Sequence, residues 1–280
     1  MIIPPACVDV AAVAAHYDDL DDLYRSLWGT NLHHGYWITG KETTEEAVNN
    51  LTRLVAERAS IKPGDRICDL GCGYGAAALA LNRRYGASVI GLTISEKQVH
   101  HAKAAAIAVD SVEFYLRDAL DSDLPAASFD AVIAIESSEH MANKPRFFLE
   151  THRLLRPGGR CVITAWLVCS RPGPWTVRHL IEPICLEGRL PSMASTAEYR
   201  SMLENVGFRD VEFIDLTVGV KKTWRICAFR ILKRIFTDRS LRRVLSNRDF
   251  TNRLFAKTVF RIWLAYQTGS MRYGCFSARK

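Results

Sequence analysis

The chain has 280 residues, 48% of them hydrophobic and 24% charged, with a formal net charge of +7. This is the composition of an ordinary globular protein, and the length suffices for one large domain or a domain with a lid. It excludes a small disulfide-stapled scaffold, and no apolar run approaches the roughly 18 residues that a membrane span needs. Because residues 1–15 also lack the features of a signal peptide, we expect a cytoplasmic protein whose eight cysteines are reduced.

The charge is unevenly distributed along the chain. Residues 221–280 hold 16 Lys and Arg against 2 Asp and Glu, a net charge of +14, whereas the rest of the chain holds 21 basic and 28 acidic residues. An acidic body with a strongly basic C-terminal segment indicates an anionic partner, which could be a membrane surface, a phosphate-bearing substrate or a nucleic acid.

Strands and helices are expected to alternate after a helical start at residues 11–60. Short apolar runs predict strands, and Ala/Leu-rich or capped segments between them predict helices. The expected strands are 66–70, 88–92, 112–116, 131–135 and 160–166, and the expected helices are 76–84, 95–108 and 145–155. The turn Pro157-Gly158-Gly159 is expected to end the last of these helices. This alternation predicts a parallel sheet with helices on both faces.

The alternation breaks after Trp166. A loop at 171–174, a helix at 196–206 closed by Gly207, and a sixth strand at 211–216 are expected next. The segment 219–269 reads as helical and basic, and the last strand is expected at 272–278. We therefore predict a cap at 1–60, a core at 61–168, connecting elements at 169–218, a basic helical lid at 219–269 and the last strand of the core sheet at 270–280.

A glycine loop carries the main chemical signal. Asp69-Leu-Gly71-Cys-Gly73-Tyr-Gly75 directly follows the first expected strand and opens a helix. Glycines let the backbone approach a ligand, and the helix start offers free N–H groups. The spacing G-x-G-x-G after an acidic strand residue differs from the G-x-G-x-x-G of pyrophosphate-binding loops, which argues against a nicotinamide oxidoreductase.

Several further segments accompany this loop in the same order along the chain. They are Tyr17-Asp18, Trp28-Gly29, His33 to Trp37, Gly91 to Ser95 with Gln98, Leu116 to Ala119, Ser128 to Val132, and Leu154 to Gly159. Together with Ile67 to Gly75 they resemble class I S-adenosylmethionine-dependent methyltransferases. Within that class they are similar to the subgroup of tocopherol, sterol and cyclopropane-fatty-acid methyltransferases, specifically over 17–168 and more loosely over 190–280. The resemblance implies an α/β, Rossmann-like methyltransferase fold: a mostly parallel seven-stranded sheet with a helical N-terminal cap and a helical lid inserted before the last strand.

The resemblance also implies where S-adenosyl-L-methionine binds. Asp69 would attract the amino end of its methionine, and the ring of Tyr17 would lie near the sulfonium, where an aromatic face is favourable. Thr93 stands where a ribose-binding acid is usual, so Thr93 and Gln98 are expected at the ribose or adenine. The complete set of expected cofactor contacts is Tyr17, His34, Gly35, Asp69, Gly71, Gly73, Thr93, Gln98, Asp118 and Ala119.

The candidate catalytic residues follow the fourth expected strand. Glu136, Glu139 and His140 lie at the carboxyl edge of the sheet, where ligands of open α/β folds bind. Each could remove a proton from the acceptor or steady a positive charge, or could instead have a structural role. No metal site is expected, because the adjacent pairs His33-His34 and His100-His101 lack partners at ligand spacing.

The basic segment 222–236 divides into two sides on a helical wheel. Lys222, Arg225, Arg230, Lys233 and Arg234 fall largely on one side, and Trp224, Cys227, Ile231, Leu232 and Ile235 on the other. This pattern fits an interfacial helix on an anionic membrane, and equally an ordinary lid helix whose apolar side packs on the core. A phosphate clamp for a diphosphate-bearing acceptor is a third interpretation.

The function expected first is methyl transfer to a small lipophilic acceptor, an isoprenoid, sterol-like molecule or phenolic lipid, with carbon as the expected site. The alternative is an O- or N-methyltransferase of a soluble natural product. A basic nucleic-acid-binding protein on the same fold is disfavoured, because neither an adenine-methylating motif nor an aromatic RNA-binding motif is present, so no nucleic-acid partner is expected. The sequence leaves the acceptor and the oligomeric state open.

Overall fold

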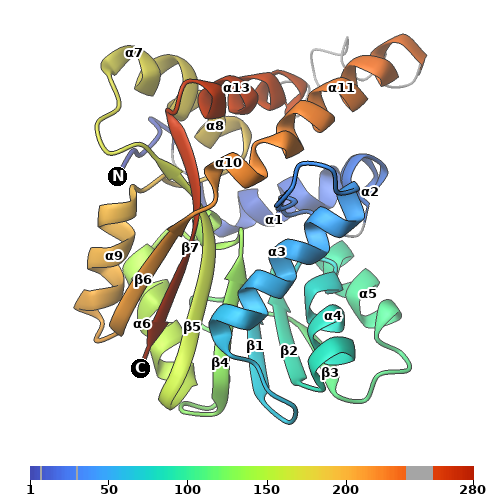
Figure 1. Cartoon of the computed structure of the whole chain (residues 1–280), viewed down its shortest axis with the longest axis vertical. Helices are drawn as coiled ribbons and strands as arrows, with labels where there is room; N and C mark the ends of the chain where they lie inside the picture. The colour runs from blue at the N-terminus through green and yellow to red at the C-terminus, as the bar shows by residue number, and fades with distance from the viewer. Residues whose placement is uncertain (7, 30, 238–254) are drawn as a thin grey trace.

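A seven-stranded sheet with the order β3-β2-β1-β4-β5-β7-β6 organises the chain (Figure 1). This computed structural model describes residues 1–6, 8–29, 31–237 and 255–280. The strands are β1 (Arg66–Leu70), β2 (Ser88–Thr93), β3 (Val112–Leu116), β4 (Phe129–Ile135), β5 (Leu155–Val168), β6 (Arg209–Asp215) and β7 (Met271–Arg279). Strands β1 to β5 pair in parallel, and β7 runs antiparallel between β5 and β6. The predicted fold class is confirmed.

Helices cover both faces of the sheet and its carboxyl edge. One face carries α3 (Thr44–Ala59), α4 (Ala76–Tyr85) and α5 (Glu96–Ala105), and the other carries α6 (Lys144–Leu154) and α9 (Thr196–Asn205). The carboxyl edge, at the top of Figure 1, carries α1 (Val10–Asp19), α2 (Asp21–Trp28), the 3₁₀ turn η1 (Ser138–His140), α7 (Pro174–Thr176), the π-helical turn η2 (Val177–Ile181), α8 (Glu182–Glu187), α10 (Thr217–Val220), α11 (Lys222–Thr237) and α13 (Phe255–Gln267).

Alternating strand residues build two hydrophobic cores. On β4, Ile133 and Ile135 face the core with α3 and α4, whereas Val132 and Ala134 face the core with α6 and α9. A strand buried on both faces reads as a continuous apolar run, which is why the sequence located these strands well. Each fully buried large aliphatic side chain contributes about 1.5–3 kcal/mol to folding, and these cores supply the rigid base of the site.

The two helix ends that the sequence predicted are confirmed, but one helical segment was not expected. Ser95 caps α5 by accepting from Gln98 N at 3.1 Å, and Gly207 follows α9 with φ +101°, both as expected. Residues 174–187 are helical rather than connecting loop. Within the expected lid, α10, α11 and α13 are helical, and residues 238–254 lie outside the described part of the chain.

The expected turn at Pro157 does not separate α6 from the fifth strand. Strand β5 begins at Leu155, opposite Phe129 of β4, and the register shifts before Arg160 pairs with Ala131. Residues 156–159 therefore form an irregularity inside the strand, with Gly158 at φ +79°. The chain end stabilises it, because Gly158 N donates to Lys280 O at 3.1 Å and Lys280 N donates to Gly159 O at 3.0 Å. This distant partner is not visible in the local sequence.

No helix among the described residues is both long and apolar enough to cross a bilayer. The cysteines of the described residues are free thiols, and Cys7 lies outside them.

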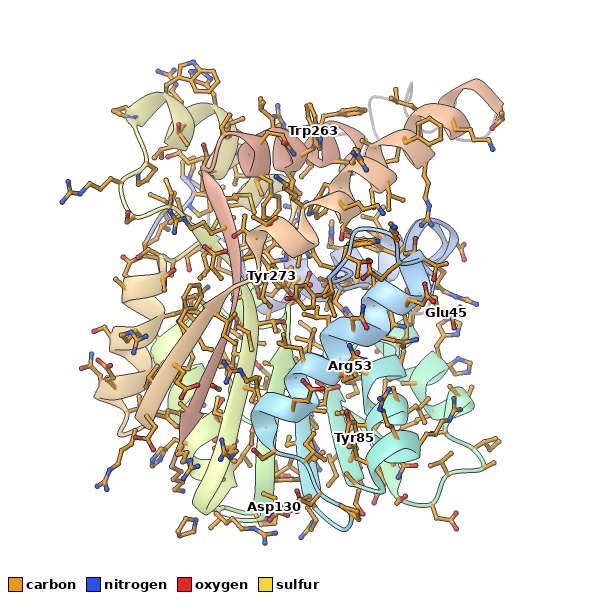
Figure 2. The ribbon with its side chains drawn as sticks, in the orientation of Figure 1. Glu45, Arg53, Tyr85, Asp130, Trp263 and Tyr273 are labelled. Carbon is orange, nitrogen blue, oxygen red and sulfur yellow. The ribbon has the colours of Figure 1, made fainter. Side chains whose placement is uncertain are left out.

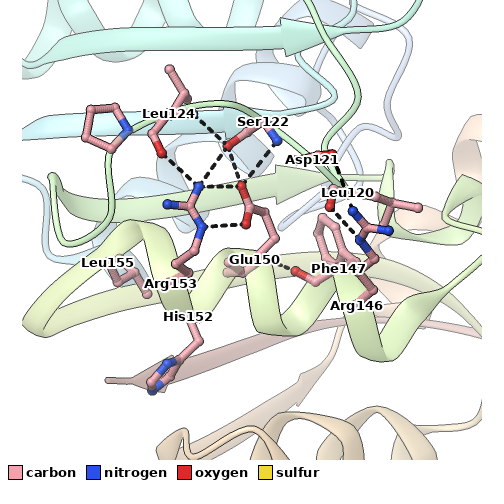
Figure 3. Close-up of polar contacts among 12 residues, drawn as sticks. Leu120, Asp121, Ser122, Leu124, Arg146, Phe147, Glu150, His152, Arg153 and Leu155 are labelled. Carbon is pink, nitrogen blue, oxygen red and sulfur yellow. Dashed lines mark hydrogen bonds and ion pairs between the residues drawn. The ribbon is translucent and has the colours of Figure 1, made fainter.

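An ion pair between the buried Glu150 and the partly exposed Arg153 fixes the loop that follows β3 (Figure 3). Glu150 of α6 accepts from Arg153 Nε and Nη2, both at 2.7 Å, and from the hydroxyl of Ser122. Arg153 also donates to Leu124 O at 2.8 Å. Burial alone would raise the pKa of Glu150, but Arg153 and Ser122 hold it below its ordinary value. The loop starting after β3 is thereby tied to a core helix.

Replacing Arg153 with Ala should lower the free energy of unfolding by about 2 kcal/mol, because the Glu150 carboxylate loses two charge-assisted hydrogen bonds, although solvent screens the 40% exposed Arg153. The matched control is Arg146→Ala on the same helix. Arg146 pairs with Asp121 at 3.4 Å, with the two side chains 56% and 81% exposed, so its removal should cost at most about 1 kcal/mol. Urea unfolding measures both, and equal losses would contradict the assignment.

Candidate active site

Within the described residues, a large pocket lies at the carboxyl ends of the parallel strands. The helices α1, α2, α11 and α13, which contribute to its lining, lie at this edge of the sheet (Figure 1). Its walls come from the N-terminal helices, the ends of β1, β2, β4 and β5, and the helices α11 and α13. Its lining includes the polar side chains of Asp69, Thr93, Gln98 and Asp118. It also includes the mostly apolar side chains of Val10, Val13, Tyr24, Leu32, Met141, Trp166, Leu190, Trp224 and Ile262.

The glycine loop turns tightly beneath this pocket. Gly71 has φ +87°, and a Cβ there would lie 2.3 Å from the Cβ of Ser137, so only glycine fits between the ends of β1 and β4. Gly73 has φ +54°, and a Cβ there would meet nothing within 4 Å. The first glycine thus serves packing, and the second leaves open space where a ligand can approach the backbone.

Asp69, the next-to-last residue of β1, has a carboxylate oxygen without a hydrogen-bond donor among the described residues. This oxygen is Oδ2, and Asp69 is 2% exposed. Burial raises the pKa of Asp69 to about 7. A buried carboxyl without a donor is costly unless a ligand supplies one, so this residue fits the ammonium of a bound amino acid moiety.

The ends of β2 and β3 supply the next polar group. Thr93 Oγ1 donates to Gln98 Oε1 at 2.8 Å, and both residues are 5% exposed. Asp118 uses one carboxylate oxygen to accept from Leu120 N at 2.8 Å. These bonds fix the orientation of Gln98 and Asp118 at the pocket wall before any ligand binds.

The side chain of Glu136 accepts four hydrogen bonds. Its Oε1 accepts from His34 N at 2.6 Å and from Tyr273 OH at 2.7 Å. Its Oε2 accepts from His34 Nδ1 at 2.7 Å and from Trp166 Nε1 at 2.9 Å. Burial alone would raise the pKa of Glu136, but the interactions with His34 and Trp166 hold it well below the usual range of a carboxyl. Its φ of +54° is uncommon for a residue with a side chain and shows that the backbone is constrained there.

His34 joins this carboxylate to the helices above it. Trp224 Nε1 of α11 lies 2.5 Å from His34 Nε2, and an indole N–H can only donate. His34 Nε2 is therefore an acceptor, and Nδ1 carries the proton that it donates to Glu136. The hydroxyl of Tyr266 of α13 lies 3.4 Å from the same Nε2. The N-terminal segment, the sheet and both lid helices thus meet at one imidazole.

Glu139 and Lys144 behave differently from Glu136. Glu139 is 2% exposed and accepts from Trp166 N at 2.5 Å. Burial, with a smaller contribution from the charge of Glu136, raises the pKa of Glu139 to about 8. Burial lowers the pKa of Lys144 to about 8, and its ammonium donates to the carbonyls of Glu139, Met141 and Ser192 at 3.2, 3.3 and 3.2 Å. Lys144 therefore holds the turn that presents His140.

Two residues of the pocket lining, Tyr17 and His140, are joined by a direct hydrogen bond. His140 Nδ1 lies 3.1 Å from the carbonyl of Arg189, which can only accept, so Nδ1 carries the proton. The lone pair of His140 Nε2 then accepts from Tyr17 OH at 2.8 Å. Burial lowers the pKa of His140 to about 4 and raises that of Tyr17 above its ordinary value. The pair is neutral, with an unprotonated imidazole nitrogen directed toward the pocket residue Tyr17.

The structure gathers twelve of the thirteen predicted site residues in this pocket. They are Tyr17, His34, Asp69, Gly71, Gly73, Thr93, Gln98, Asp118, Ala119, Glu136, Glu139 and His140. Gly35 does not line it. A Cβ at Gly35 would lie 2.7 Å from the ring of Trp37, and its N–H donates to Thr223 Oγ1 at 3.2 Å, so Gly35 serves close packing beneath α11. The individual roles of the thirteen site residues stay predictions.

Sequence reasoning missed Lys144, Trp166, Tyr266 and Tyr273. Lys144 directly precedes the expected helix 145–155 and belongs to none of the motifs, and Tyr266 and Tyr273 lie in the region 190–280, where the resemblance is looser. Trp166 lies near the carboxyl end of β5, at the same edge of the sheet as Glu136, and that shared edge was the one available signal.

The strand order, the glycine loop and the unsatisfied Asp69 define a class I S-adenosylmethionine-dependent methyltransferase, and S-adenosylmethionine is its cofactor. The chain belongs to the mycolic acid cyclopropane synthetase family, whose model matches residues 7–274.

The chain is similar to methyltransferases of small molecules. It is 35% identical over 218 residues to 27-O-demethylrifamycin SV methyltransferase of Amycolatopsis mediterranei, a match that covers 76% of this chain and 79% of that protein. It is 29% identical over 235 residues to the chloroplastic tocopherol O-methyltransferase of Arabidopsis thaliana, covering 76% and 67%. A crystal structure of a mycolic acid cyclopropane synthase with SAH and CTAB shares the fold, with a TM-score of 0.86, 21% identity and coverage of 98% and 99%.

Replacing Glu136 with Gln should lower the free energy of unfolding by about 3 kcal/mol or more, because an amide cannot accept four hydrogen bonds and turns its NH₂ toward other donors. The matched control is Glu139→Gln. Since Glu139 is largely protonated at neutral pH and Gln has the same shape, this control should change stability by less than about 1 kcal/mol. Chemical unfolding at pH 7 measures both; a tolerated Glu136→Gln would show that the carboxylate is not an anchor.

Asp69→Asn should weaken S-adenosylmethionine binding by about 30-fold or more, because the buried partner of an ammonium loses its charge. Asp123→Asn, at a carboxylate 89% exposed on its side chain, is the control and should bind normally. Because a pKa near 7 leaves Asp69 partly protonated, wild-type affinity should rise between about pH 6 and 8. Unchanged calorimetric affinity in folded Asp69→Asn would exclude Asp69 as the ammonium partner.

Proposed function

We propose that this methyltransferase transfers a methyl group to a hydroxyl oxygen of an apolar small molecule, and that His140 removes the proton. The observation that carries the proposal is the hydrogen-bonded chain from Tyr17 OH through His140 to the carbonyl of Arg189. This chain leaves His140 neutral and gives its basic nitrogen a defined direction. The O-methyltransferases among the similar proteins support the same choice.

The proposed step conserves atoms and charge. S-adenosylmethionine, when bound, supplies an electrophilic methyl group on a sulfonium. The acceptor hydroxyl attacks that carbon, a C–O bond forms as the S–C bond breaks, and the electron pair of the S–C bond stays on sulfur. The acceptor proton passes to the hydroxyl oxygen of Tyr17 as the Tyr17 proton passes to His140 Nε2, which leaves an imidazolium. The protein contributes alignment and proton removal.

The apolar side chains that line the pocket support a lipophilic acceptor. Its lining combines aliphatic side chains of Val13, Leu190 and Ile262 with the indoles of Trp166 and Trp224. Such a surface binds by excluding water and orients a ligand through few polar groups. An acceptor with one hydroxyl and an extended apolar body would suit both the Tyr17–His140 chain, which removes the proton, and the apolar side chains of the lining.

Carbon methylation, the outcome expected first from the sequence, is the second candidate. A carboxylate could steady a carbocation formed in that reaction, and Glu139 is a carboxyl group that lines the pocket. The raised pKa of Glu139 disfavours this role, because a neutral carboxyl stabilises a cation poorly, whereas Glu136 is already saturated with donors. Mass analysis of the product formed from host lipid extract and labelled cofactor distinguishes an ether from a new C–C bond.

His140→Ala should lower kcat by about 10²–10⁴-fold with little change in cofactor affinity, because a general base is lost. The exposed His100 supplies the control variant His100→Ala, which should be fully active. Since the pKa of His140 is about 4, His140 stays unprotonated as the pH falls, and the acidic limb of kcat should lie well below pH 6.

Tyr17→Phe tests the same chain independently. It removes the donor to His140 and opens space for water, so the acidic limb should move toward the ordinary histidine range near about 6.5. An acidic limb near that value in the wild type, or normal turnover by His140→Ala, would contradict the role of His140 without affecting the cofactor assignment.

A further inference from the structure

The helix α13 buries one apolar face and exposes another. Val259, Ile262 and Tyr266 are at most 4% exposed and pack inward. Phe260, Trp263 and Leu264, at the spacing of one helical stripe, are 37%, 37% and 38% exposed. Figure 2 shows Trp263 at the upper end of the molecule, beyond the pocket. A surface helix usually presents polar residues outward, so this stripe is unusual.

The neighbouring helix α11 corrects the simplest membrane interpretation of the sequence. Its apolar side, with Trp224, Cys227 and Ile231, is 3–4% exposed and packs on the core, so it does not face a bilayer. The outward stripe consists instead of Arg225, Phe229, Leu232 and Lys233, and Phe229 and Leu232 are 69% and 42% exposed. The side chains of residues 234–236 lie outside the description.

Charge distinguishes what kind of partner this face can accept. Neither α11 nor α13 contains an Asp or Glu, and the segment 221–280 has a net charge of +14. Aromatic and aliphatic side chains beside exposed cations match the boundary of an anionic bilayer, where apolar groups enter the acyl region and cations meet head groups.

We propose that the outer lid face, formed by Phe229 and Leu232 of α11 and by Phe260, Trp263 and Leu264 of α13, docks on an anionic lipid surface with the help of Arg225 and Lys233. The inner sides of these same helices line the pocket through Thr223, Trp224, Thr258 and Ile262. Docking by this face therefore places the lipid beside the helices whose inner sides line the pocket. The binding itself does not depend on which atom is methylated.

Sedimentation with vesicles of phosphatidylcholine, with and without phosphatidylglycerol, tests this proposal on the full chain. The wild type should bind the anionic vesicles and be released by salt. Phe260→Gln/Trp263→Gln/Leu264→Gln should weaken binding about tenfold or more, because the inserted groups become polar. Arg225→Gln/Lys233→Gln should weaken it about 30-fold at low salt and reduce its salt dependence. Both variants should keep wild-type S-adenosylmethionine affinity, which also shows that they are folded.

Matched control variants lie far from this face. Ile107 and Leu149 are 89% and 55% exposed, so Ile107→Gln/Leu149→Gln removes equally apolar surface elsewhere. Arg83→Gln/Lys103→Gln removes two exposed cations from α4 and α5. Both control variants should bind vesicles like the wild type.

Three results would overturn the proposal. The first is no binding of the wild type to anionic vesicles. The second is binding by the two lid variants that equals that of the wild type. The third is weakening by the control variants that equals that of the lid variants. Sedimentation velocity supplies a further check: a wild-type dimer that the triple apolar variant converts to a monomer would assign this face to a second copy of the chain.

Discussion

The buried carboxylate of Glu136 is the constraint on which the arrangement of the site depends. Removing a carboxylate from water costs several kcal/mol, and this cost is offset only if donors surround it. Here the donors come from the N-terminal segment through His34, from β5 through Trp166 and from β7 through Tyr273. Because His34 also accepts from Trp224, the position of the lid is coupled to the ionisation of one side chain in the sheet.

The number of donors explains why the pKa values of Glu136 and Glu139, three residues apart, shift in opposite directions. Glu136 receives four donors and holds a full negative charge. Glu139 receives fewer donors, is more deeply buried at 2% exposed and lies in the field of that charge, so its pKa is raised. Neither is a good proton acceptor at neutral pH, the first because its lone pairs are used and the second because it is already protonated. The lone pair of the neutral His140 imidazole is also in use, but its donor is the hydroxyl of Tyr17, which can pass on its own proton as it takes one from the acceptor. His140 is therefore the group in the turn that can receive a proton through a relay.

The sequence predicted the sheet and most of the pocket because both follow from local rules. Parallel strands are buried on both faces and read as apolar runs, and the carboxyl edge of such a sheet gathers the residues that follow each strand. Asp69, Asp118 and Glu136 were located in this way. The network around His34 could not be predicted, since its members are separated by up to 239 residues and carry no local pattern. The irregular start of β5 failed for the same reason, because its partner is the chain end.

The two faces of the lid helices follow from one requirement. A pocket that excludes water while accepting an apolar molecule needs an apolar inner wall, which Trp224 and Ile262 provide. An ordinary lid would be polar outside, yet Phe229 and Trp263 keep the outer surface apolar as well. This arrangement has a cost in solubility, which the surrounding positive charge reduces through repulsion between molecules. Positive charge has a different effect near an anionic bilayer, where it attracts the same face to the lipid. The composition of α11 and α13 is thus compatible with solution and with a membrane surface, and the local charge of the surroundings decides between them.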